Sequence, residues 1–526
     1  MSKKKNLSKA ILVSISLLFS QLAYPANGDE WQRVKISYPE KMYVVNTVSQ
    51  FIEHSGHTSG STLRFNKPNG DGTITIISCP SFQSPGCIEA TPRQMQASIT
   101  FPRCDAKIKN WCIKEVLLYE NGNKSKEAEF VKYIDGDTLV AEPLNRLPQG
   151  GTLSLWKIKG DTSANPTLFA VNVVQFMIWD PQPYFFQLSA GIYPVTLKQG
   201  KEYFAETINK NEKGEYGAYE YKVSPKCENA IFTSNGECGS KILFPKNLRI
   251  GLSIVVPNEV DGFISGRLED IKLSTYSNDG DLSSKVISID ALPIKIPRLG
   301  LSLTKEQAVA MIGSELGDDG MDWVAEDNRQ DGDTLRRFEY LRKYAEDRSS
   351  GFSSVWNFTN LSAISSVKRC KIPVGSFPGL ISTNAMIVDP NPPSFVDGEF
   401  VYQVAGMHYE PDGLTLSSGD YTLVISKFLS DCLYSSSEVP ISASVSVINS
   451  ETGDKKVSVT SIKRDFDYYT LNISGFNFSK PEIRVRFNFA PNKSTIKKST
   501  ITCVRGKQSK IITAVSPKCP AGYKKK

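Results

Sequence analysis

The sequence lacks the short motifs that identify the best-known catalytic chemistries. It has no HExxH, GxSxG, P-loop or EF-hand pattern, and only three histidines, His54, His57 and His408, occur in 526 residues. A zinc protease, an α/β hydrolase, a P-loop NTPase or an EF-hand protein with its usual motif is therefore excluded. We expect a protein that is not an enzyme, with no cofactor, no catalytic residues and no metal ligands.

A second absence concerns membrane spans. After residue 22 no apolar run approaches the roughly 20 residues that a spanning helix needs. The start of the chain is different, because Lys3, Lys4, Lys5 and Lys9 precede an apolar stretch, Ala10–Leu22, and small residues follow at 23 and 26. This order predicts a secretory signal peptide over residues 1–26, with an uncleaved anchor as the alternative. We therefore expect a secreted or extracellular protein associated with the cell envelope.

Acidic residues are absent from both ends of the chain. The net charge is +7, of which the signal region contributes +4 and residues 493–526 contribute +10, so the part between them carries −7. This distribution gives no indication of a nucleic-acid-binding body. The tail can attract an anionic cell-wall polymer or a membrane surface, and a solubilising tail with no partner is the alternative. Its cations are Lys493, Lys497, Lys498, Arg505, Lys507, Lys510, Lys518, Lys524, Lys525 and Lys526.

The spacing of the cysteines indicates whether they bind zinc or form disulfides. No two of the ten lie at the two-to-four-residue spacing of zinc ligands, which leaves zinc as the less favoured explanation. An even number of cysteines behind an export signal is typical of disulfides. Proximity in the sequence suggests the pairs Cys79 with Cys87, Cys104 with Cys112, Cys227 with Cys238, and Cys503 with Cys519. Cys370 and Cys432 remain, and they are expected to join two strands of one module.

The pattern of residues predicts a mainly β protein with several β-sandwich-like domains. Strands are expected at Thr73–Ile77, Phe169–Trp179 and Leu248–Val256, and a further strand over 286–296 is expected to end at Pro297. Helical spacing is found only in the middle, from Thr304 to Gly317 and again from about Thr334. The expected divisions are a signal peptide (1–26), an N-terminal β domain (27–185), a second β domain (186–300), a helical segment with an acidic loop (301–365), a C-terminal β-sandwich (366–492) and a basic two-cysteine tail (493–526).

The last large region shows strict period-two alternation. Ile441, Ala443, Val445 and Val447 alternate with serines, and Ile483, Val485, Phe487 and Phe489 alternate with polar residues. A sheet with one buried face requires this pattern.

Several segments of the last third resemble uncharacterised exported or cell-surface proteins of high-GC Gram-positive bacteria. The segments are Val401–Ala405, Gly419–Tyr421, Cys432–Tyr434 and Gly475–Ser479, followed by a tail that reads CVRGK at 503–507 and VSPKCPAGYKKK at 515–526. The resemblance covers about a third of the chain. It implies a bacterial envelope or extracellular protein, and it brings no established activity and no catalytic residues.

Three other segments are candidate sites. Seven acids in residues 317–333 suggest weak calcium binding, but the ligand spacing of a known calcium loop is missing, which favours a solvated loop. His54 and His57 lie three residues apart without an identifiable third metal ligand, and His408 is expected to be structural. Trp179, Tyr184, Phe185 and Phe186 could stack on a sugar, although a core role is favoured.

These observations lead to one main functional expectation. The chain is expected to be an exported, non-enzymatic binding or structural protein whose β modules hold a glycan or protein ligand, and whose cationic tail keeps it at the envelope. No nucleic-acid partner is expected. The alternatives are a secreted glycan-directed hydrolase with an unidentified pair of carboxylates, which leaves no sequence signature, and an adhesive component that associates with itself.

Overall fold

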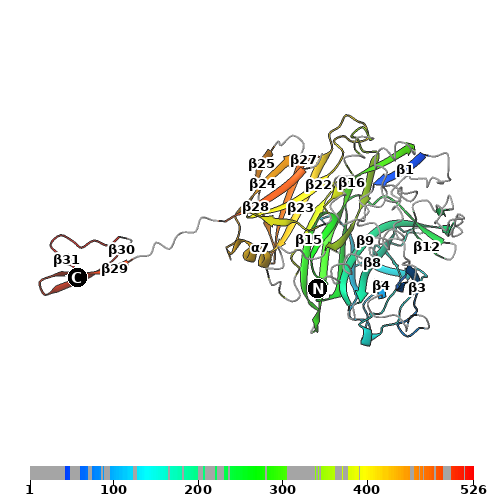
Figure 1. Cartoon of the computed structure of the whole chain (residues 1–526), viewed down its shortest axis with the longest axis horizontal. Coiled ribbons are helices and arrows are strands. Elements are labelled where there is room, and N and C mark those ends of the chain that lie inside the picture. The colour runs from blue at the N-terminus through cyan, green and yellow to red at the C-terminus, as the bar shows by residue number, and fades with distance from the viewer. Residues whose placement is uncertain are drawn as a thin grey trace.

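A computed structural model describes most of the chain between residues 42 and 526 (Figure 1). The described residues are 42–47, 60–68, 74–84, 87, 95–122, 127–163, 166–179, 183–199, 205–207, 219–221, 230–234, 237–278, 281–304, 338, 342, 345–361, 370, 373, 377–389, 391–436, 438–449, 455–460, 462–465, 467–478, 481–489, 499–514 and 516–526. The predicted signal peptide lies outside them. Within these ranges no helix has the length and apolar character needed to cross a bilayer.

The protein is mainly β, as the sequence predicts, and one long sheet runs through most of it. Its centre is β8 (Leu168–Trp179), which is almost entirely buried because its apolar and β-branched side chains face packed layers on both sides. β8 pairs with β9 (Pro183–Gln199) along its whole length. On its other edge β8 pairs with β4 (Met95–Thr100) and β7 (Ser154–Lys157), beyond which lie β2 (Thr62–Pro68), β3 (Ile74–Ser78) and β6 (Glu129–Tyr133).

The same sheet continues from β9 into the C-terminal half. β9 pairs with β13 (Glu237–Lys241) and with β18 (Asn357–Leu361), and β18 leads to β15 (Phe263–Asn278). Beyond β15 follow β19 (Gly379–Thr383), β23 (Ser418–Ser426), β27 (Tyr468–Asn477) and β26 (Lys463–Arg464). Two small hairpin elements, β12 (Ala230–Ser234) on β13 and the pair β10 (Ala205–Thr207) with β11 (Tyr219–Tyr221), complete this part.

A second sheet shares β15 with the first. It contains β5 (Cys112–Glu120), β14 (Leu248–Pro257) and β16 (Asp281–Thr304), and β15 joins it through residues 268–278 after pairing with β18 through residues 263–267. The partner of β15 changes between Arg267 and Leu268, and a break in register follows between Glu269 and Lys272, where Asp270 has φ 47°. A bulge of this kind lets one strand bend from one sheet into another. The largest buried cluster fills the space between the two sheets.

A third sheet covers the C-terminal half. It consists of β20 (Ile387–Val388), β21 (Ser394–Val396), β22 (Glu399–Ala405), β28 (Pro481–Asn488), β24 (Ser442–Asn449) and β25 (Lys455–Thr460). The predicted alternation is confirmed for Ala443, Val445, Ile483, Val485 and Phe487, which are all buried. It is wrong for Ile441, which precedes β24 and is 55% exposed. This sheet forms a sandwich with β19, β23 and β27.

Strands β23 and β27 are therefore buried on both faces. Leu423 and Ile425 of β23 belong to the core of the C-terminal sandwich, whereas Val424 between them belongs to the core shared with the second sheet. In β27, Tyr469 belongs to the core of the C-terminal sandwich and Tyr468 to the core shared with the second sheet. Successive side chains of a strand point to opposite faces, so the middle sheet is a layer between two others. The C-terminal sandwich is thus packed directly against the rest of the body.

One helix differs from the prediction. The sequence predicts helical structure only in the middle of the chain, but α7 (Lys427–Tyr434) follows β23 in the C-terminal sandwich. Ser426 caps it by accepting a hydrogen bond from the Leu429 amide, and Ser435 ends it in a left-handed conformation. In the expected second helix, Phe338 and Arg342 are helical and Ala345 lies in a turn. Thr304, the expected start of the first helix, is the last residue of β16, and the rest of that helix lies outside the described residues.

The expected end of a strand at Pro297 is wrong. β16 continues through Pro297 to Thr304, and β17 (Gly351–Val355) and β1 (Met42–Thr47) pair with this later part. Within the described residues β17 is the only partner over 294–298, so the missing N–H of proline can face an unpaired edge. The expected domain boundaries after residues 185 and 300 fall inside β9 and β16.

Disulfides join four of the five expected cysteine pairs. They are Cys79–Cys87, Cys104–Cys112, Cys370–Cys432 and Cys503–Cys519. Cys238 is disulfide-bonded as well, and Cys227 lies outside the described residues. Because a zinc-bound thiolate cannot also be a disulfide, the eight cysteines of the four pairs are not zinc ligands. The disulfides are compatible with an extracellular location.

Candidate functional site

The basic tail folds into a small sheet of its own. β29 (Ser499–Arg505) is the middle strand, with β30 (Gln508–Ala514) on one side and β31 (Lys524–Lys525) on the other. Figure 1 shows it apart from the three layers of the body. A sequence of 28 residues therefore presents its cations on an ordered surface rather than on a simple charged run.

Two glycines of the CVRGK and CPAGY segments make the turns of this sheet. Gly506 has φ 56° in the two-residue connection between Arg505 and Gln508, which suits the first central position of a type II′ hairpin turn. Gly522 has φ 86°, and the Tyr523 amide donates to the Pro520 carbonyl at 2.9 Å, as in a type II turn. Both positions favour glycine because an L side chain rarely adopts positive φ.

A disulfide replaces the hydrophobic core that so small a sheet cannot build. Cys503 is fully buried and bonds to Cys519, 16 residues later, and Ile501 is the other well-buried side chain on that face. Closing a loop of this length contributes about 3 kcal/mol in the chain-entropy account. The Tyr523 hydroxyl donates to Gln508 Oε1 at 3.0 Å, and Lys510 Nζ lies 5.2 Å from the centre of the Tyr523 ring.

The described part of the tail carries seven exposed cations and no acid. They are Arg505, Lys507, Lys510, Lys518, Lys524, Lys525 and Lys526. The remaining expected members, Lys493, Lys497 and Lys498, lie outside the described residues. Since residues 493–526 contain no carboxylate side chain, no acid within the tail can neutralise this charge.

The strand register divides these cations between two faces. Lys510 and Lys525 lie directly opposite Cys503, one on each neighbouring strand, so they share the disulfide face. Lys524 lies opposite Val504, and the Lys526 amide donates to the Thr502 carbonyl at 2.8 Å, which places both on the other face. Three consecutive lysines thus alternate between faces, a feature that no composition analysis could reveal.

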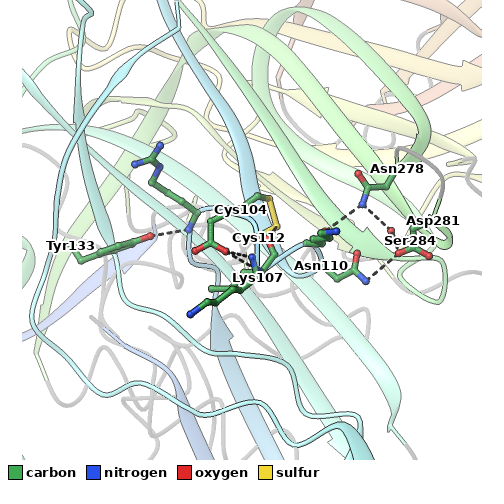
Figure 2. Close-up of a disulfide and its surroundings, with 12 residues drawn as sticks. Cys104, Lys107, Asn110, Cys112, Tyr133, Asn278, Asp281 and Ser284 are labelled. Atoms are coloured by element: carbon green, nitrogen blue, oxygen red, sulfur yellow. Dashed lines mark hydrogen bonds between the residues drawn. A yellow bond between two sulfur atoms is a disulfide. The ribbon is translucent and has the colours of Figure 1, made fainter.

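A second ordered surface lies around the Cys104–Cys112 disulfide (Figure 2). The Asp105 carboxylate accepts the amides of Lys107 and Ile108, both at 2.7 Å, and fixes the loop from within. Asn110 Nδ2 donates to Asp281 Oδ2 at 3.2 Å, and Asn278 Nδ2 donates to the Lys109 carbonyl at 3.3 Å. Hydrogen bonds from Ser283, Ser284 and Asn110 lower the pKa of Asp281. The loop is therefore fastened to the β15–β16 turn through Asn110 and the Lys109 carbonyl.

In an aromatic cluster next to this loop, the rings contact one another and an arginine side chain. The Arg103 guanidinium lies 4.6 Å from the centre of the Phe130 ring and 5.3 Å from that of Trp156. Phe130 contacts Tyr133 and Trp156 through ring centroids 4.9 and 5.5 Å apart. Because Arg103 covers a ring face that a sugar would use, we assign this cluster to packing rather than to glycan stacking.

His408 occupies a contact between two loops. Its amide donates to Asp347 Oδ1 at 3.0 Å, and its Nδ1 is hydrogen-bonded to Asp347 Oδ2. Asp347 and Glu346 both have positive φ, 56° and 53°, and the Tyr409 amide donates to the Asp347 carbonyl at 3.1 Å. Both carboxylate oxygens of Asp347 are thereby used to hold one loop against another, which is the structural role expected for His408.

One exposed carboxyl group, that of Glu269, has a raised pKa. Partial burial, then the nearby carboxylates of Asp420 and Asp270, raises the pKa of Glu269. Glu269 lies at the bulge of β15, just after that strand changes sheets. No local pattern predicts this grouping, because Asp420 is about 150 residues away and reaches Glu269 only through the pairing of β15, β19 and β23.

The other candidate sites give no further chemistry. Trp179 is buried in the core, with Nε1 donating to the Asn145 carbonyl at 2.7 Å, as the core interpretation of the aromatic run predicts. The described part of the structure does not include several other candidates. These are the side chains of Tyr184 and Phe185, the loop histidines His54 and His57, and the acidic segment 317–333. Among the residues that the structure describes, no three His, Cys, Asp or Glu side chains are grouped so that they could hold a metal ion.

Comparison with known proteins gives this chain no family. No family model matches it, and neither a curated protein nor a solved structure does.

Proposed function

We propose that the chain is an exported, non-enzymatic surface protein whose β body serves as a binding or structural module and whose tail keeps it at the envelope. The observation that carries the proposal is the tail itself: seven cations on a disulfide-bonded sheet with no acid among residues 493–526. Such a sheet offers fixed positive charge to an anionic wall polymer or surface. The disulfides and the N-terminal signal pattern support exposure outside the cell.

Deleting residues 493–526 should move the protein from the cell-associated fraction into the medium. The reason is that the remaining chain carries net negative charge once the signal is removed. The measurement is the ratio of cell-bound to free protein in growing cultures. A matched variant of full length, in which the seven described cations of the tail are replaced by glutamine, should be released as well. Salt washes should release the unmodified protein from the cells. Unchanged cell association of both variants contradicts the proposal.

A second function, a secreted glycan hydrolase, has one observation in its favour. A general acid needs a carboxyl group with a raised pKa near other carboxylates, and Glu269 meets that requirement. If this function holds, the protein releases reducing ends from a cell-wall polysaccharide, and Glu269→Gln lowers the rate at least about 100-fold. Glu115→Gln, at an exposed position of β5, is the matched control and should retain activity. No release from a panel of polysaccharides and peptidoglycan contradicts it.

A further inference from the structure

The face of the C-terminal sheet opposite the disulfide is uncovered. Strand pairing places Thr500, Thr502 and Val504 of β29 on it, with Ser509, Ile511 and Thr513 of β30 and Lys524 of β31. The hydroxyl groups of Thr500 and Thr513 are 2.8 Å apart across the strands, which confirms that they share a face. Ile511 is 72% exposed, so the middle of this face is open to solvent.

The chemistry of this open face suits phosphate better than lipid. Threonine and serine hydroxyls donate to phosphate oxygens, and lysines at the edge supply charge. A membrane-binding face would instead need several large apolar or aromatic side chains, and Ile511 is the one exposed large aliphatic residue that the described tail offers. The aromatic residue of the tail, Tyr523, bonds to Gln508 Oε1 and contacts Lys510, and both of these lie on the disulfide face.

The two faces also differ in how their lysines are used. Lys510 lies over the Tyr523 ring, and Lys525 lies across β29 from it, beside the buried Cys503. Lys524 and Lys526 lie beside Val504 and Thr502 at the rim of the hydroxyl-bearing face. A linear polyanion that crosses the open face would meet the hydroxyls first and these two lysines at its edge.

We propose that the open face of the C-terminal sheet is a docking surface for a polyol-phosphate polymer of the cell wall. The inference rests on the proposed function and specifies the partner of the same tail. The charge of the tail, +10 without an acid, complements a chain with one negative charge at each phosphodiester. The hydroxyl groups would select phosphodiesters over polymers whose charge comes from carboxylates.

The test compares two variants of the full exported chain that remove the same charge. Lys524→Gln with Lys526→Gln alters the open face, and Lys510→Gln with Lys525→Gln alters the disulfide face. The probe is soluble poly(glycerol phosphate), with affinity measured at several salt concentrations. We expect the open-face variant to bind at least about tenfold more weakly and to lower the salt slope by about 0.7 for each phosphate that is no longer neutralised. The disulfide-face variant should change the slope by less than half as much.

A third variant tests the hydroxyl groups without changing the charge. Thr500→Val with Thr513→Val preserves the β-branched shape and should weaken binding to poly(glycerol phosphate) about tenfold. Binding to polygalacturonate, a polyanion of carboxylates, should be weaker than binding to the phosphate polymer and should not respond to this variant. Thermal unfolding of each variant shows that the fold is kept.

Several results would overturn this assignment. Equal losses in the two lysine variants would mean that charge alone acts, and tighter binding to phosphatidylglycerol vesicles or to single-stranded DNA would identify another partner. If deletion of 493–526 still releases the protein while the lysine variants behave alike, the proposed retention stands and only the docking face is wrong. If neither the deletion nor any variant has an effect, both proposals fail.

Discussion

Replacing Arg249 with methionine should lower the free energy of unfolding by about 3 kcal/mol, because the change leaves the mostly buried carboxylate of Asp290 without its cation. The Arg249 side chain is 2% exposed and lies between two acids. Its Nε donates to Asp290 Oδ1, and its Nη1 and Nη2 donate to Asp270 Oδ2 and the Asp270 carbonyl, both at 2.6 Å. The Tyr119 hydroxyl donates to the second oxygen of Asp290.

The contribution of the Arg249 charge to stability can be separated from that of its packing. Asp290 is 17% exposed and Asp270 is 51% exposed, so most of the expected loss comes from Asp290. Adding Asp290→Asn to Arg249→Met should recover part of the lost stability, since it removes the unpaired charge. The stability of Arg249→Lys should lie between those of the unmodified protein and Arg249→Met. Lysine keeps the positive charge, but its ammonium group cannot bridge both acids as the planar guanidinium does. Urea unfolding measures all three, and a loss below about 1 kcal/mol for Arg249→Met would show that the network is not stabilising.

Removing the Cys370–Cys432 disulfide should have an effect of similar size. The bond closes 62 residues, and in the chain-entropy account this restricts the unfolded chain by about 4 kcal/mol. It also ties α7 to the segment before β19, and Cys370 is buried in the core of the C-terminal sandwich. We therefore expect Cys370→Ser with Cys432→Ser to lower the unfolding free energy by about that amount.

The Cys104–Cys112 pair supplies the comparison for this prediction. It closes only eight residues, so Cys104→Ser with Cys112→Ser should cost about 2 kcal/mol by the same account. The measurement is urea unfolding of both double variants beside the unmodified protein under non-reducing conditions. A loss at Cys104–Cys112 equal to or larger than that at Cys370–Cys432 would contradict the dependence on loop length.

Much of the fold follows from local patterns in the sequence. The alternation at 443–447 and 483–487 predicts one-sided strands because a two-residue period must match the pleat of a sheet. The continuous apolar run at 169–179 predicts a strand buried on both faces, which β8 is. Three of the four cysteine pairs can be predicted because closely spaced cysteines close short loops at little entropic cost. Cys370 and Cys432 are far apart and were paired only as the remaining two, and Cys432 lies in α7 rather than in the expected strand.

Features that depend on pairing between distant strands could not be predicted from the sequence. β15 changes sheets between Arg267 and Leu268, and nothing in the residues nearby indicates that its two halves have different partners. α7 was missed because its eight residues make only about two turns and follow directly on a strand, although Ser426 is a standard capping residue. The two faces of the basic tail depend on which residue lies opposite Cys503, and only the register of β31 determines that.

The 24 residues of β16 bond in turn to β14 and β15, then to β17, and finally to β1 near the start of the described chain. Contacts so distant in sequence form slowly, and until they form, the edges of four strands have no cover. β1 therefore cannot pair until residues 299–304 have been synthesised, although β2, β3, β4, β7 and β8 can already pair with one another. The first described strand is thus completed by a partner that leaves the ribosome much later.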